Sequence, residues 1–94
     1  MNAVIKREYD KLLEAVEELL EGGEDWVEDS LGEAFEDVIG SFELEEFAEK
    51  NEIKDVGGLV RSNKLDDEQK KEILEKWAES LEELTSIEVE LDFE

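Results

Sequence analysis

Apolar residues recur every three or four positions along most of this chain, and that spacing produces the one-sided apolar stripe of an amphipathic α-helix. No proline interrupts the stripes. The first stripe consists of Val4, Ile5, Tyr9, Leu12, Leu13, Val16, Leu19 and Leu20. It predicts a helix over residues 3–21, which the Gly22-Gly23 pair ends because glycine readily adopts the left-handed conformation found at helix termini.

Further stripes predict a mainly α fold, a small four- to five-helix domain in which residues 1–94 form a single acidic helical domain. The second helix is expected at residues 25–39, with Gly40 as its stop. The third is expected at residues 43–50, with Ser41 as its N-cap.

The fourth segment is ambiguous, because a short helix capped by Asp55 and a loop over residues 55–63 both fit the Gly57-Gly58 pair. The fifth helix is clearer and is expected at residues 67–84. It follows Asp66, which stands three residues before Gln69 as a capping box requires.

Both tryptophans, Trp26 and Trp77, lie on the apolar stripes of the second and fifth helices. Aromatic side chains on such stripes usually fill the core, so we expect both to be core anchors. An exposed contact with a partner protein is the alternative.

The last stretch changes its period from that of a helix to that of a strand. Ile87, Val89, Leu91 and Phe93 alternate with acids, which predicts a C-terminal β-strand. A lone strand leaves its backbone groups unpaired, so it needs a partner strand. That partner could be another strand of this chain, a second copy of the chain or a target protein. We expect the second copy, in a homodimer that uses these four residues. A disordered acidic tail is the alternative.

The charges are unevenly placed along the sequence. There are 31 acids and 10 bases, for a net charge of −21. Residues 12–49 hold 15 acids and no base, and residues 77–94 hold 7 acids and no base. The rest of the chain is nearly balanced, so the whole excess lies in these two base-free stretches.

Acids that stand four residues apart on a helix repel one another, at about 0.2–0.5 kcal/mol per pair. Several such pairs, Glu17 and Glu21 among them, fall in the first two predicted helices. Helix neighbours are about 5–6 Å apart, so a row of carboxylates can imitate a row of phosphates. The predicted partner-binding residues are Glu14, Glu17, Glu18, Glu21, Glu24, Asp25, Glu28, Asp29, Glu33, Glu36 and Asp37.

In size, helical content, extreme acidity and acidic helices such as residues 14–21 and 79–83, the chain resembles the phage class of acidic DNA-mimic inhibitors. That class includes anti-restriction and anti-CRISPR proteins. The resemblance implies a stoichiometric, non-catalytic inhibitor that blocks a nuclease or another nucleic-acid-binding enzyme. It also implies a host-cell cytoplasmic location if the protein is phage-encoded.

The composition argues against several other classes. The chain has no His and no Cys, which removes the commonest general base and metal ligands, so we expect no enzyme activity, no cofactor and no metal site. No apolar run is long enough for a membrane span, and we expect a cytoplasmic protein. Because like charges repel, we expect no direct binding to nucleic acid or to a membrane, and the charge favours cations, basic proteins or a second copy as partners. Together with the phosphate-like rows and the resemblance, this predicts a basic nucleic-acid-binding protein as the partner.

Three alternatives remain open at this point. An acidic immunity protein or antitoxin would neutralise one basic toxin by specific contact. A structural or assembly subunit would use its surfaces in a larger complex. The acids could also be the solvated helix faces of a protein from a salt-adapted organism, although the 10 bases are mostly lysine, which speaks against this.

Overall fold

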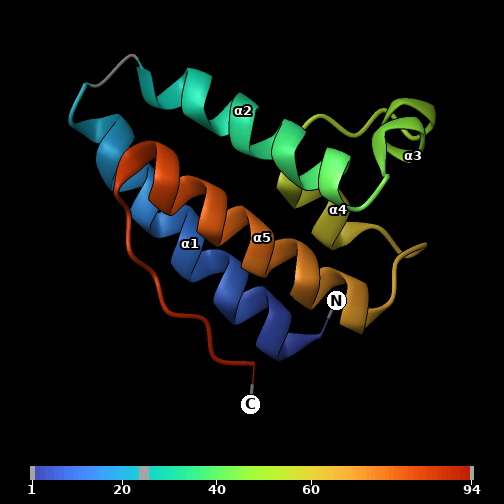
Figure 1. Ribbon diagram of the computed structural model, residues 1–94. Coiled ribbons are helices and arrows are strands. Elements are labelled where there is room, and N and C mark those ends of the chain that lie inside the picture. Colours follow the sequence, from blue (N-terminus) through green and yellow to red (C-terminus); the bar gives the residue numbers. More distant parts are fainter. Residues whose placement is uncertain (1, 24–25, 94) are drawn as a thin grey trace.

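The computed structural model describes residues 2–23 and 26–93, and five α-helices lie within them (Figure 1). Their bounds are α1 Ala3–Glu21, α2 Trp26–Ser41, α3 Glu45–Lys50, α4 Val56–Arg61 and α5 Asp67–Thr85. The prediction of a mainly α fold is therefore confirmed. The described residues contain no β-strand, so the predicted C-terminal strand is not formed.

The long helix α5 lies at the centre of the fold. It packs most extensively against α2 and also contacts α1 and α4. Figure 1 shows that α1 and α5 lie side by side and run in the same direction, whereas α2 runs in the opposite direction. The core between these helices is fully buried and includes Ile5, Leu12, Val38, Leu59, Ile73, Leu74 and Leu81.

Side-chain caps fix the starts of three helices. The carboxylate of Asp55 accepts a hydrogen bond from the Gly58 N–H at 2.8 Å, which settles the fourth segment as a helix. Asp66 and Gln69 form the predicted capping box of α5. Asn2 caps α1 by accepting from the Val4 N–H, a contact that the apolar stripes do not indicate.

Two predicted boundaries around the third helix are wrong. Gly40 does not stop α2, which continues to Ser41, and α3 begins at Glu45 after Leu44 rather than after a Ser41 cap. The chain turns instead at Glu43, whose φ of 55° is left-handed. Tertiary packing explains the extension, because Ile39 and Phe42 pack against the core and outweigh the ~1 kcal/mol that a helical glycine costs.

Trp77 is a core anchor, but Trp26 is not. Trp77 is only 5% exposed and stacks on Tyr9 with 6.1 Å between ring centroids, whereas Trp26 is 44% exposed. The neighbouring Val27 is fully buried. Because successive helix residues point about 100° apart, Val27 takes the inward position at the start of α2 and turns Trp26 toward the surface.

The Gly57-Gly58 pair allows α4 to pack closely against its neighbours. A Cβ atom at Gly57 would lie 2.6 Å from the Tyr9 hydroxyl, and one at Gly58 would lie 2.9 Å from a methyl carbon of Ile53. Neither distance is tolerable for a real Cβ, so the two glycines serve helix packing.

This packing predicts opposite effects for two glycine-to-alanine substitutions. Gly57→Ala forces Tyr9 away from α4 and should cost about 1–3 kcal/mol. Gly32→Ala, in the exposed middle of α2 with no atom near the new Cβ, should instead stabilise by up to about 1 kcal/mol. Urea unfolding of both variants measures the difference. Equal effects would show that α4 does not pack against Tyr9 as described.

The C-terminal residues fold back along the helices instead of forming a strand. Ser86, with φ 64°, reverses the chain after α5, and residues 87–93, here called the strap, run back beside α1 (Figure 1). The side chains of Ile87, Val89, Leu91 and Phe93 are half-buried against the core. The alternation therefore arises because the apolar side of this segment packs on helices. That packing does not require a partner strand.

No helix in the described part of the chain combines the length and hydrophobicity that a membrane crossing needs.

Candidate acidic interface

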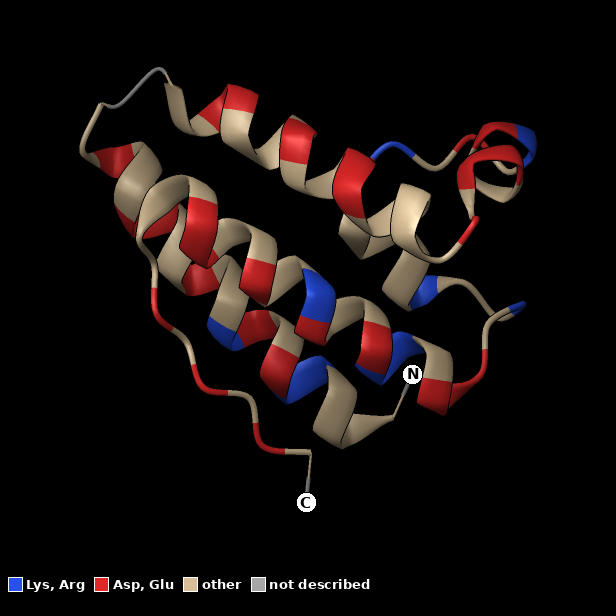
Figure 2. Cartoon of the chain, in the orientation of Figure 1, with Lys and Arg blue, Asp and Glu red and all other residues tan. Residues whose placement is uncertain are grey.

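The fold brings the two base-free stretches of the sequence together. Because α1 and α5 run in the same direction, their C-terminal halves lie at the same end of the molecule, next to the start of α2. Figure 2 shows acidic ribbon and no Lys or Arg at that end, while the bases are spread over the middle and the opposite end of the molecule. The exposed acids that define this acidic end are Glu17, Glu18, Glu21, Glu28, Asp29, Glu79, Glu82 and Glu83.

The acidic end carries an electrostatic cost beyond the repulsion along each helix. The C-terminus of a helix is the negative end of its dipole, where bases stabilise and acids destabilise by about 0.3–1 kcal/mol. Neither α1 nor α5 has a base in its last turn, and each carries acids there instead. The dipoles of the two helices point the same way, so both negative ends meet here. Glu28 and Asp29 instead lie in the first turn of α2, at the positive end of its dipole, where acids stabilise. The electrostatic cost therefore falls on the acids at the ends of α1 and α5.

The predicted partner-binding residues are exposed wherever they are described. These are Glu14, Glu17, Glu18, Glu21, Glu28, Asp29, Glu33, Glu36 and Asp37. Glu24 and Asp25 lie outside the described residues. Within the described chain, no ion pair within 4.0 Å involves any of the nine. Their charges therefore face solvent without a basic neighbour in contact.

The structure does not bring the acids of α1 and α2 into one stripe. Each helix buries the opposite side, with Val16 inward on α1 and Ala34 inward on α2. The two acidic rows therefore diverge from the turn at Gly22-Gly23. They approach one another only at the acidic end.

The acids of the strap and of α5 form a second acidic surface, which was not among the predicted partner-binding residues. A hollow on one side of the strap is lined by Glu14, Glu18, Glu88 and Glu90, together with Lys11, Ala15 and Val89. A hollow on its other side is lined by Glu75, Glu79 and Glu82, together with Ala78, Val89 and Leu91. Carboxylates from three segments thus lie side by side, and only the fold of the strap could reveal this.

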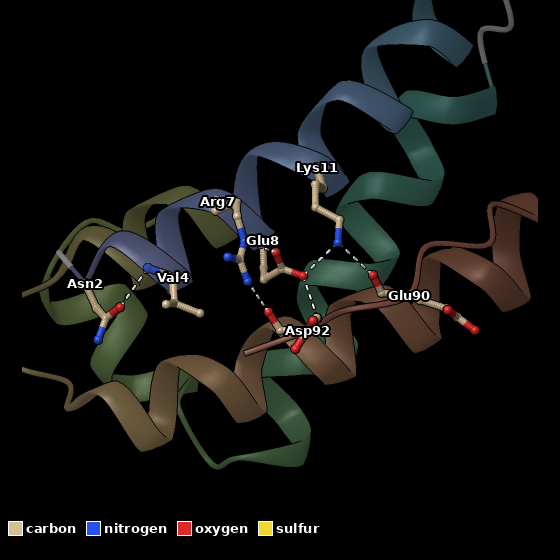
Figure 3. Close-up of polar contacts among 7 residues, drawn as sticks. All are labelled: Asn2, Val4, Arg7, Glu8, Lys11, Glu90 and Asp92. Carbon is tan, nitrogen blue, oxygen red and sulfur yellow. Dashed lines mark hydrogen bonds and ion pairs between the residues drawn. The ribbon is translucent and has the colours of Figure 1, made fainter. Parts of the chain in front are cut away.

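One acid, Glu8, has a different role, because it is fully buried. Its carboxylate pairs with Arg7 at 2.8 Å and with Lys11 at 2.9 Å (Figure 3). The Asp92 backbone N–H also donates to it. Sequence analysis missed Glu8, although a signal existed, since it stands at the stripe position between Ile5 and Leu12.

The charge of Glu8 is stabilised by these contacts. Burial raises its pKa, but the hydrogen-bond donors outweigh burial and lower the pKa from 4.5 to about 2. Glu8 is therefore ionised at neutral pH. A buried charge that keeps its donors is tolerated, whereas a donor's removal leaves it uncompensated.

The described residues contain no group of three or more Asp or Glu side chains that could hold a metal ion. No family model, curated protein or solved structure matches the chain. What the arrangement offers chemically is a dense set of exposed carboxylates on a helical scaffold.

Proposed function

We propose that this protein is a non-catalytic acidic inhibitor, which imitates nucleic-acid phosphates and blocks a nucleic-acid-binding enzyme such as a restriction or CRISPR nuclease. The observation that carries the proposal is the meeting of two base-free stretches at one end of the molecule (Figure 2). At the C-terminal ends of α1 and α5 that arrangement opposes helix stability, which supports selection for binding there.

The geometry of the acids supports phosphate imitation. Neighbours on a helix face stand about 5–6 Å apart, a spacing comparable to that of phosphates along a nucleic-acid strand. The rows on α1 and α5 flank the acids of the strap, so the charged surface is wider than one helix. A basic groove that accepts a duplex could accept such a surface.

The net charge of −21 favours one class of partner. A duplex would be repelled at long range, whereas a positively charged cleft would attract the protein and speed its association. The partner we propose is a basic nucleic-acid-binding protein, and the protein acts on it without binding nucleic acid.

The double substitution Glu17→Gln with Glu21→Gln tests whether the acidic end serves binding. We expect it to weaken partner binding while holding or raising the melting temperature, because it removes a like-charge pair and an unfavourable dipole contact. Affinity can be measured against the protein that the immobilised chain captures from its source organism. A clear fall in melting temperature would show that these carboxylates are structural.

Glu68→Gln with Glu72→Gln is the matched control. These two exposed acids have the same spacing but lie in the part of α5 where bases are interleaved. We expect partner affinity to be unchanged in this variant. An equal loss of affinity in both variants would point to net charge rather than to the acidic end.

A second candidate function is an immunity protein or antitoxin that neutralises a basic toxin. One observation favours it: Leu20 and Trp26, the exposed large hydrophobic residues of the described chain, lie at the end of α1 and the start of α2, beside the acidic end. An exposed tryptophan can be the anchor of a specific interface. In that case Trp26→Ala would abolish most of the affinity and salt would change it little.

The homodimer through Ile87, Val89, Leu91 and Phe93 stays a prediction. These side chains pack against their own core, so a dimer that uses them requires the strap to leave its helices. Light scattering at low and high salt tests it, and a monomer at both would contradict it.

A further inference from the structure

The strap is attached to the rest of the fold in an unusual way. Within the described residues, no backbone-to-backbone hydrogen bond joins residues 87–93 to a helix. The strap has no regular secondary structure, and its apolar side chains are only half-buried. Its position therefore depends on side-chain contacts rather than on a hydrogen-bonded ladder.

At the start of the strap the Ile87 N–H donates to Thr85 Oγ1 of α5 at 3.4 Å, and the polar contacts farther along come from one short stretch of α1. Arg7 donates to the Asp92 carbonyl oxygen, and Lys11 donates to the Glu90 carbonyl oxygen at 3.1 Å. Between them, Glu8 accepts from the Asp92 N–H (Figure 3). These three side chains, here called the latch, hold backbone groups of the strap, and Glu8 also aligns the two bases by pairing with both.

The two ends of the strap experience opposite electrostatic forces. Near Glu90 and Asp92 the latch supplies the two positive charges of Arg7 and Lys11 against the single negative charge of Glu8. At the near end of the strap, Glu88 lies beside Glu14 and Glu18 of α1, and α5 contributes Glu79 and Glu82 on the other side. Repulsion there works against docking, so the latch must supply much of the polar attraction that keeps the strap in place.

The helices do not share this dependence. Their contacts consist of fully buried apolar residues on α1, α2, α4 and α5. Segments with few buried contacts open locally at a lower free energy than a packed core does. The strap and the helical core therefore differ in what holds them.

We propose that residues 87–93 form a releasable strap, which the Arg7–Glu8–Lys11 latch holds over α1 and α5 and which opens without unfolding the helices. Release uncovers the apolar surface beneath Val89 and Leu91 and frees an acidic arm. The latch works in this way whatever the acidic surface binds.

Hydrogen exchange of the full-length protein, followed by mass spectrometry or NMR, tests this at neutral pH. Glu8→Gln keeps the side-chain shape but removes the charge that aligns the two bases. We expect the Asp92 amide, the strap N–H that donates to the latch, to exchange at least tenfold faster, while helical amides in α2 and α5 change less than twofold. Glu17→Gln is the control, because Glu17 is an exposed acid on the same helix that lines neither hollow. We expect it to leave the exchange rates of the strap and of the helices unchanged.

Lys11→Gln keeps the test decisive if Glu8→Gln fails to fold. The Lys11 side chain is 43% exposed, and its loss leaves Glu8 paired with Arg7. We expect the same selective acceleration in the strap. Strap exchange that is unchanged in the folded variants, or strap and helix amides that accelerate together in Lys11→Gln, would overturn the proposal.

Discussion

Trp77→Ala is expected to remove about 3–5 kcal/mol of stability, the usual cost of deleting a large buried aromatic side chain. Trp77 lies at the junction of α5 and α1, where it stacks on Tyr9. The Tyr9 hydroxyl in turn touches α4 at Gly57. Three helices therefore lose contacts at once. Small domains are stable by only about 5–15 kcal/mol, so the variant should be largely unfolded on mild heating.

Trp26→Ala is the matched control, because it removes the same side chain from a surface position. With Trp26 44% exposed, we expect a loss below about 1 kcal/mol. Urea unfolding followed by far-ultraviolet circular dichroism avoids relying on the fluorescence of the residue that is replaced. Similar losses in the two variants would contradict the core described above.

Displacement of nucleic acid is the second large effect that we expect. Alone, the protein should give no complex with DNA or RNA in a mobility-shift assay, because both carry like charge. Added to a complex of its target enzyme with DNA, it should release the DNA. The acidic-end variant Glu17→Gln with Glu21→Gln should release less at the same concentration, and Glu68→Gln with Glu72→Gln should match the unmodified protein.

Salt should weaken the protein's own binding to the target enzyme, measured without DNA. Proteins that contact 6–10 phosphates lose about 10³–10⁵ in DNA affinity between 50 and 200 mM salt. The helical carboxylates carry a less dense counterion atmosphere than a duplex does, so we expect a smaller fall, of about tenfold or more. An antitoxin anchored by Trp26 and Leu20 would lose much less, which separates the two candidate functions.

The helices could largely be predicted from the sequence, because their signals are local. The stripe of α1 and the capping box at Asp66 each depend on residues within a few positions of one another, and both predictions are confirmed. The predicted helix end at Gly40 was wrong, because the packing of Ile39 and Phe42 against the core outweighs the local preference of glycine.

The candidate site was less predictable, because it depends on how the helices are arranged. The apolar stripes do not indicate the relative direction of two helices. The base-free stretches come together because α1 and α5 run in the same direction. Alternation at Val89 and Leu91 is compatible with a strand or with a strap, and the basic side chains of α1 favour the strap by holding its backbone. Trp26 faces outward because Val27 fills the buried position.

The most direct test of the central claim is a competition titration. The target enzyme, captured by the immobilised protein from its source organism, is loaded with a fluorescent DNA duplex, and the protein is added while DNA anisotropy is recorded. We predict that anisotropy falls to the value of free DNA as a complex of enzyme and protein forms. A stable ternary complex of enzyme, DNA and protein would contradict phosphate imitation in the nucleic-acid groove.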